Sequence, residues 1–241
     1  MTSTRGIEVA LLAACVLAGC ASPKTTIQID DSDVNLPTMR VVIPFRQLDE
    51  SDVILHNGSA VEIAFTSGNG QDTQELQPGQ DPVELGPTTI IAPQSLTNEF
   101  NFQYLEGLYR WRLVHASGAY GLELLAGSGY LRSQLTVSST TQRATDKLDA
   151  YGVGLGLGGL WQLRPGTLLQ ARLLQARLIS STGTGDFDDM TRFEAFLVQS
   201  LGRHAAARLG YGNWQIRVDP SVNSGLRLKA SGPAFGLDLS F

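Results

Sequence analysis

The chain has 241 residues, of which 42% are hydrophobic and 17% charged, and its formal net charge is −5. This composition is too apolar for a disordered protein and too mixed for a helical membrane protein, and the length suits one large β domain with an arm. Two cysteines, both within the first 20 residues, exclude a disulfide scaffold and a four-thiolate zinc site.

Residues 1–19 have the pattern of an export signal peptide. Arg5 precedes an apolar run from Val9 to Ala18 that is too short to span a bilayer as a helix. The tetrapeptide Leu17-Ala18-Gly19-Cys20 resembles the bacterial lipobox. This resemblance implies lipidation of Cys20 and, because Ala21 follows it, sorting to the outer membrane of a Gram-negative bacterium. An ordinary signal peptide followed by a chance cysteine is the alternative.

The next part of the chain is acidic and rich in proline. From Cys20 to Thr97 there are three basic and eleven acidic residues, and seven of the ten prolines lie in this stretch. Asp30, Asp31 and Asp33 form a dense acidic cluster. Such composition predicts a poorly packed segment with short strands embedded in it, such as Met39–Ile43. We therefore expect residues 20–58 to be a lipidated, extended arm in the periplasm.

From residue 98 onward, large apolar residues alternate with small or polar ones. The clearest example is Tyr151–Trp161, in which glycine occupies most even positions. Because successive side chains of a strand point to opposite faces, this period of two predicts strands with one apolar face. We predict eight strands, at residues 59–67, 98–113, 118–137, 147–163, 167–180, 190–201, 204–217 and 226–241.

One predicted strand contains an internal repeat. The sequence Leu-Leu-Gln-Ala-Arg occurs at residues 168–172 and again at 173–177. A five-residue period fits a strand with one apolar face only if a bulge near Leu173 reverses the two faces. An amphipathic helix is the alternative for this stretch.

The links between the predicted strands fall into two classes that alternate along the chain. Short links are expected at 114–117, 164–166 and 202–203, and long polar links at 68–97, 138–146, 181–189 and 218–225. Short periplasmic turns that alternate with longer extracellular loops are typical of outer-membrane barrels. Aromatic residues near the short links, namely Tyr109, Trp111, Trp161 and Phe241, favour an interfacial girdle on that side.

These features together resemble a known architecture. Residues 59–241 resemble the small eight-stranded outer-membrane barrels of the OmpA and OmpX type. The ending Leu237, Leu239, Phe241 resembles the C-terminal signature that the barrel-assembly machinery reads. The resemblance implies an all-β fold, an eight-stranded antiparallel up-and-down transmembrane β-barrel with an N-terminal acidic arm. It also implies two partners, outer-membrane lipid and the assembly machinery.

Charged residues lie on the predicted strand faces opposite the apolar ones. Arginines and carboxylates that point into an eight-stranded barrel can pair with one another, because that diameter is just wide enough for side chains to fill. We therefore expect a packed polar interior rather than a pore. The residues assigned to this network are Glu106, Arg110, Arg112, Glu123, Arg172, Arg208, Arg217 and Asp238.

Other candidate sites carry weaker signals. The glycine run 152–159 lacks the strand, turn and helix context of a phosphate-binding loop, so we expect its glycines to leave room for inward arginines. His56, His115 and His204 have no recognisable serine motif beside them, and the acidic loop at 186–189 lacks a complete calcium-binding pattern. Arginines interspersed with apolar residues argue against a nucleic-acid surface. We expect no catalytic site, cofactor or metal.

The sequence thus predicts a non-enzymatic, monomeric outer-membrane β-barrel lipoprotein with a role in envelope structure, envelope integrity or surface interaction. One alternative is a soluble, lipid-tethered barrel that faces the periplasm and binds an apolar ligand. That alternative requires apolar residues inside and polar residues outside, the reverse of our assignment. The other alternative is a membrane-embedded enzyme that modifies lipid, which requires a catalytic constellation.

Overall fold

The computed structural model describes residues 27–31, 34–45, 57–85, 88–180, 187–218 and 226–240. The proposed signal peptide, Cys20 and Phe241 lie outside these residues. All regular structure in the described ranges is β-strand. The strands are β1 (Ile27–Asp31), β2 (Leu36–Pro44), β3 (Gly58–Leu76), β4 (Val83–Leu85), β5 (Thr88–Ile90), β6 (Gln94–Val114), β7 (Tyr120–Ser138), β8 (Arg143–Arg164), β9 (Thr167–Ser180), β10 (Phe187–Ser200), β11 (Ala205–Val218) and β12 (Leu226–Ser240).

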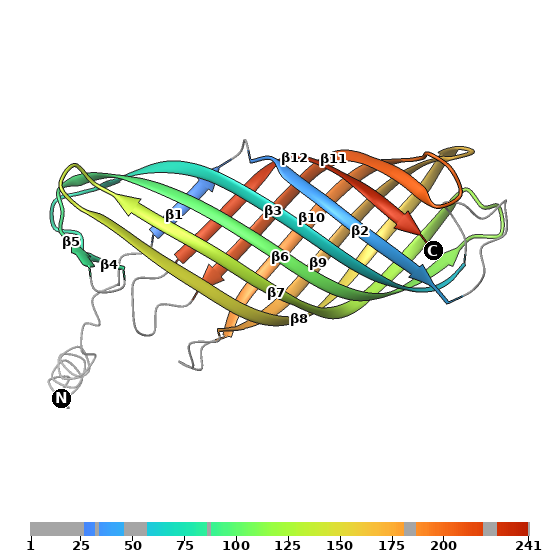
Figure 1. Cartoon of the computed structure of the whole chain (residues 1–241), viewed down its shortest axis with the longest axis horizontal. Helices are drawn as coiled ribbons and strands as arrows, with labels where there is room; N and C mark the ends of the chain where they lie inside the picture. The colour runs from blue at the N-terminus through green and yellow to red at the C-terminus, as the bar shows by residue number, and fades with distance from the viewer. Residues whose placement is uncertain are drawn as a thin grey trace, which may run out of the picture.

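One large sheet contains most of these strands, and it closes on itself. Its order is β1-β12-β11-β10-β9-β8-β7-β6-β3-β2, and β12 also pairs with β2. The succession of pairings therefore returns to its start, and the strands run obliquely around a closed sheet (Figure 1). Closure pairs backbone groups around the circumference, where an open sheet would leave two free edges. Strands β4 and β5 form a separate small hairpin.

A strand occupies each of the eight positions predicted from the alternation, as β3 and β6–β12. The described part of the sheet nevertheless differs from an eight-stranded one, because β1 and β2 join it from the segment that we expected to be a separate arm. Both pair in parallel with β12, whereas the other pairings within the sheet are antiparallel. The short strand expected at Met39–Ile43 lies within β2, where the buried Arg40 and Val42 alternate with the exposed Met39 and Ile43.

The acidic cluster of the arm helps to hold β1 in place. Asp31 Oδ2 accepts a hydrogen bond from the Gln71 amide of β3 (2.9 Å), and Asp72 Oδ2 accepts one from the Asp30 amide (3.0 Å). Asp30 also pairs with Lys229 of β12 (3.0 Å). These two aspartates, expected to be solvated in a loose arm, therefore link β1 to its two neighbours. Asp33 lies outside the described residues.

Turns of different lengths define the two ends of the closed sheet. The short-turn end carries the links 115–119, 165–166 and 201–204, and at it Gly118 and Gly166 adopt positive φ angles of 69° and 81° that favour glycine. The opposite end, here the loop end, carries the β4–β5 hairpin and the link 139–142. The predicted loop 138–146 was wrong, because its polar residues continue the β7–β8 ladder up to the pair Ser138–Arg143 and leave a turn of four residues, 139–142.

Candidate functional site in the lumen of the closed sheet

The outer face of the closed sheet is apolar over a broad band. On β8, every second residue from Tyr151 to Leu163 points outward, and the exposed fractions reach 70% for Leu155 and 63% for Leu157. Exposed apolar side chains also cover β2, β3, β6, β7 and β9–β12, among them Ile63, Leu105, Trp111, Leu124, Leu173, Leu197, Leu209 and Phe235. A contiguous exposed apolar surface of this size marks an interaction surface.

This band has a definable height. Along β8 it covers twelve residue steps, which correspond to about 40 Å of strand and, at a tilt of about 45°, to about 28 Å along the axis. Toward the loop end the outward side chains become polar, as on β6, where the exposed outward series Ser95, Thr97, Glu99, Asn101 and Gln103 precedes Leu105. The apolar surface is therefore a belt with a polar border.

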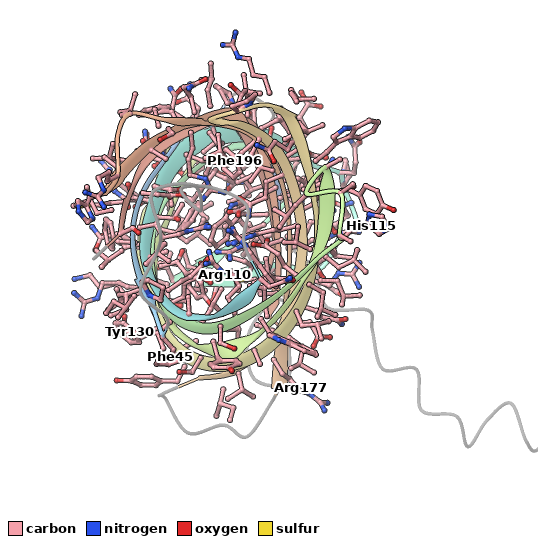
Figure 2. The ribbon with its side chains drawn as sticks, turned by 90° about the vertical axis from the view of Figure 1, so that its right-hand side faces the viewer. Phe45, Arg110, His115, Tyr130, Arg177 and Phe196 are labelled. Atoms are coloured by element: carbon pink, nitrogen blue, oxygen red, sulfur yellow. The ribbon has the colours of Figure 1, made fainter. Side chains whose placement is uncertain are left out.

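The lumen of the short-turn half has the opposite character, because charged side chains fill it. Figure 2 looks onto the short-turn end and shows Arg110 and Phe196 inside the ring, with Tyr130 and Arg177 outside it. Ten charged side chains among the described residues are buried, namely Arg40, Glu62, Glu106, Arg110, Arg112, Glu123, Arg172, Arg192, Glu194 and Arg208. Burying a charge is costly unless it is paired, so this arrangement depends on pairing.

The structure places most of the predicted network inside. Six of its eight members are buried, and the side chain of Asp238 is 19% exposed where it meets Arg208. Arg217 is the exception, since it is exposed on the outer face. The ladder from β11 to β12 runs without a bulge, so residues 208 and 217, an odd number of positions apart, must point to opposite faces.

Arg172 is the centre of the network. Its guanidinium, 1% exposed, donates hydrogen bonds to Glu62 (2.8 and 3.0 Å) and to Glu123 (2.9 and 3.2 Å). Glu62 also pairs with Arg40 and Arg110, and Glu123 also pairs with Arg112. Two carboxylates and four arginines therefore form one connected group that joins β2, β3, β6, β7 and β9.

A second charged group lies beside the first. Arg192 donates two hydrogen bonds to Glu106 (2.8 and 2.9 Å), contacts Glu194 (3.4 Å) and lies over the ring of Trp214 (4.7 Å to the centroid). We had not assigned Arg192, Glu194, Arg40 or Glu62 to the lumen. The signal was present, because Arg192 and Glu194 alternate with the outward Phe193 in the same way as the assigned pairs do.

The two copies of the five-residue repeat place their arginines on opposite faces of β9. The ladder between β9 and β10 is regular over its whole length, so the predicted bulge near Leu173 was wrong. A five-residue shift along a regular strand moves each residue to the opposite face. Arg172 of the first copy is therefore buried, while Arg177 of the second copy is exposed.

Apolar side chains occupy the lumen toward the loop end. Phe102 and Trp214 contact each other with ring centroids 5.3 Å apart, and Ile27, Ile29, Leu36 and Leu131 are among the fully buried residues of the same cluster. Val83, Leu85 and Ile90 of the β4–β5 hairpin belong to this cluster as well. The aromatic Trp214 is thus part of the lumen core.

The glycine run of β8 leaves space for apolar side chains and for one carboxylate, and not for the inward arginines that the sequence predicted. A Cβ atom at Gly154 or Gly156 would meet Ala176 or Leu174 of β9, and one at Gly158 would meet Glu123 Oε2 at 2.8 Å. We had expected inward arginines to use this space. The glycines instead admit apolar side chains and one carboxylate of the network.

The described histidines lie outside the lumen network. His115 Nδ1 is 3.0 Å from the Ser117 hydroxyl in an exposed turn, and His204 Nδ1 is 2.9 Å from the Ser240 carbonyl oxygen. Within the described ranges, neither histidine has a hydrogen bond or ion pair to a carboxylate, and no group of His, Cys, Asp or Glu is placed to hold a metal ion. His56 lies outside these ranges.

Comparison of the chain with protein-family models, with curated proteins and with solved structures gave no match. The functional interpretation therefore rests on this chain's own residues and geometry. In the part of the chain that the structure describes, no helix has the length and hydropathy that spanning a membrane requires.

Proposed function

We propose that the protein is an outer-membrane β-barrel lipoprotein with a structural, envelope-integrity or surface-contact role. One observation carries this proposal: the closed sheet has an apolar belt outside and paired charges inside, which is the reverse of the arrangement in a soluble protein. In hydrocarbon every backbone N–H and C=O must be paired within the protein, which a closed sheet achieves. A soluble barrel that holds an apolar ligand would need the reverse placement of apolar and charged residues.

The belt also has the dimensions and borders that a bilayer would require. Its height of about 28 Å is close to the apolar band of about 25 Å on outer-membrane barrels. Tyr109, Trp111 and Trp161 lie on its outer surface toward the short-turn end, and each is more than 40% exposed. Amphipathic aromatic rings are enriched at membrane–water interfaces. These features support the placement of the short-turn end at one interface.

A structural role follows from what fills the lumen and what extends beyond the belt. Mutually paired charges are concentrated in the short-turn half of the lumen, and most of a packed apolar cluster lies in the other half. The polar ladders of β3, β6, β7 and β8 continue past the belt at the loop end. We propose that this polar extension contacts the surroundings, while the lumen network keeps the barrel rigid.

Gel mobility of the membrane-extracted protein, with and without boiling, tests the proposal. A closed transmembrane barrel resists SDS until it is heated, so we expect a heat-dependent shift of the protein from the outer-membrane fraction. We expect Cys20→Ala to keep this shift and to stay in the membrane fraction. No shift, together with release of the Cys20→Ala variant from membranes, would refute the membrane-spanning proposal and favour a soluble domain tethered by lipid.

The parallel pairing of β1 and β2 with β12 indicates on which side of the membrane the N-terminal arm would lie. Ile27 pairs with Leu226 at the loop end of β12, whereas Val42 pairs with Ser240 at the short-turn end. The chain therefore enters the sheet at the opposite end from its C-terminal residues. With short turns in the periplasm, we now propose that the segment before Ile27 lies on the outer side and not in the periplasm. Cys20 precedes Ile27 by seven residues, which span at most about 25 Å.

Labelling of intact cells with a membrane-impermeant maleimide tests this orientation. Gln80→Cys lies on an exposed turn at the loop end and Ala116→Cys on one at the short-turn end. We expect labelling of Gln80→Cys in intact cells and of Ala116→Cys only after permeabilisation of the outer membrane. An epitope tag inserted before Ile27 should be detected together with Gln80→Cys. Detection of the tag only after permeabilisation would contradict the proposed position of the arm.

A further inference from the structure

The loop-end half of the lumen is apolar, and part of what fills it does not come from the wall of the closed sheet. The interior of an outer-membrane barrel is typically polar. Here Phe102, Leu131 and Trp214 project into the lumen from the wall and are buried in one apolar cluster. Val83 and Ile90 of the β4–β5 hairpin belong to the same cluster, and both are 0% exposed. A segment outside the wall therefore occupies part of the apolar interior.

The hairpin is attached to the lumen through its side chains. Strands β4 and β5 pair with each other, and in the described part of the chain neither pairs with a strand of the closed sheet. Figure 1 shows the hairpin at the loop end, apart from the long strands. An isolated two-stranded hairpin is marginally stable in water. Its position therefore depends on the burial of Val83, Leu85 and Ile90, and an apolar molecule that replaced these side chains would break no pairing of the wall.

A polar side chain without a partner lies in the same half of the lumen. Asn98 of β6 is 0% exposed, and neither its Oδ1 nor its Nδ2 has a hydrogen-bond partner among the described residues. Leu96 and Phe100, the next inward residues of β6, and Val137, its partner on β7, all belong to the apolar cluster. Leaving a buried amide without a partner is costly. The amide can both donate to and accept from a group that enters this half of the lumen.

The charges around Asn98 favour an uncharged group. Its partner on β3 is Asp72, whose carboxylate accepts hydrogen bonds from the Asp30 and Thr73 amides. Asp31 adds a second carboxylate against β3, whereas Asp30 is paired with Lys229. Like charges disfavour each other at short range. An ionised carboxylate would therefore be repelled here, whereas a hydroxyl or an amide would hydrogen-bond to Asn98.

We propose that the loop-end half of the lumen binds a single-chain amphiphile with an uncharged hydrogen-bonding head, a hydroxyl or an amide. The head hydrogen-bonds to Asn98, and the alkyl chain takes the place of Val83, Leu85 and Ile90, so the hairpin moves aside when the ligand enters. Burial of the alkyl chain against the cluster supplies the driving force. This binding role goes beyond the structural role proposed above and does not depend on a membrane around the closed sheet.

Quenching of Trp214 fluorescence by an alkyl bromide tests the site. Trp214 is 1% exposed in the lumen cluster, whereas Trp111 and Trp161, the other two tryptophans, are exposed on the outer surface. The reference chain therefore carries Trp111→Phe and Trp161→Phe and is purified at full length in detergent. We expect ω-bromododecanol to quench Trp214 saturably. We expect ω-bromododecanoate, ionised at alkaline pH, to bind about tenfold more weakly. Equal binding of the two would overturn the assignment of an uncharged head.

Asn98→Leu separates a ligand-binding role of the amide from a structural one. An apolar side chain of similar size removes an unpartnered buried amide, so the urea midpoint should not fall, whereas binding of ω-bromododecanol should weaken about tenfold. Asn101→Leu is the matched control, because it makes the same change on the exposed outward face of β6. It should bind as the reference chain does. Equal binding by Asn98→Leu and Asn101→Leu would overturn the proposal.

A change in the hairpin tests its displacement. Val83 and Ile90 face each other across the β4–β5 ladder, and Val83→Ser with Ile90→Ser weakens their burial without a change in the wall. We expect this double variant to bind ω-bromododecanol about tenfold more tightly, because the ligand then displaces a more weakly held hairpin. Urea denaturation checks that it folds, and it remains informative if Asn98→Leu does not fold. Absence of saturable quenching in both the reference chain and this variant would overturn the proposal.

Discussion

Arg172→Met is expected to destabilise the folded protein by about 3–5 kcal/mol, because it removes the central member of a buried ion-pair network together with its charge-assisted hydrogen bonds. Arg172 serves Glu62 and Glu123 at once, with four hydrogen bonds between 2.8 and 3.2 Å. The loss is a large fraction of the 5–15 kcal/mol that typically separates folded from unfolded states. Urea denaturation, followed by gel mobility without boiling, measures the effect.

The internal repeat supplies a matched control for this experiment. Arg177→Met makes the same change at the equivalent position of the second Leu-Leu-Gln-Ala-Arg copy, where the side chain is exposed, and we expect a change of about 0.5 kcal/mol or less. Addition of Glu123→Gln to Arg172→Met should lower the stability further, because it also removes the carboxylate that pairs with the buried Arg112 at 2.6 Å. Equal urea midpoints for Arg172→Met and Arg177→Met would show that the lumen network does not determine stability.

The parts of the fold that the sequence predicts correctly depend on local alternation. The alternation of apolar with small or polar residues predicts the positions of eight strands, because successive side chains of a strand point to opposite faces. The same rule assigns Arg110, Glu123 and Arg172 to one face together with the other buried members of the predicted network. Arg217 was misassigned to the lumen. Because β11 has no bulge, a residue an odd number of positions after the inward Arg208 points outward.

The parts that were missed depend on pairing between distant segments. Nothing local in the acidic arm shows that its strands pair with β12, almost 200 residues later. The parallel closure therefore emerges only in three dimensions, and with it the pairing of Arg40 with Glu62. The division of the lumen into a charged half and an apolar half likewise depends on which strands face each other across it.

The outer belt gives the prediction with the most direct bearing on the proposed membrane location. Leu157 lies midway between Tyr151 and Leu163 on β8, and its side chain is 63% exposed. Arginine at the lipid-facing midplane of an outer-membrane barrel costs about 2–4 kcal/mol. We therefore expect Leu157→Arg to lower the free energy of unfolding in lipid vesicles by that amount, as measured by urea titration.

Gln134→Arg is the control for the belt substitution. Gln134 also points outward, from β7, but it lies on the polar extension beyond the belt, where a new charge stays hydrated. We expect this variant to differ from the unmodified chain by about 0.5 kcal/mol or less. In a soluble protein both substitutions would be nearly neutral, because both side chains are exposed to water. Equal stability of Leu157→Arg and Gln134→Arg in vesicles would therefore contradict the bilayer placement, whereas a loss confined to Leu157→Arg follows only if hydrocarbon surrounds the belt.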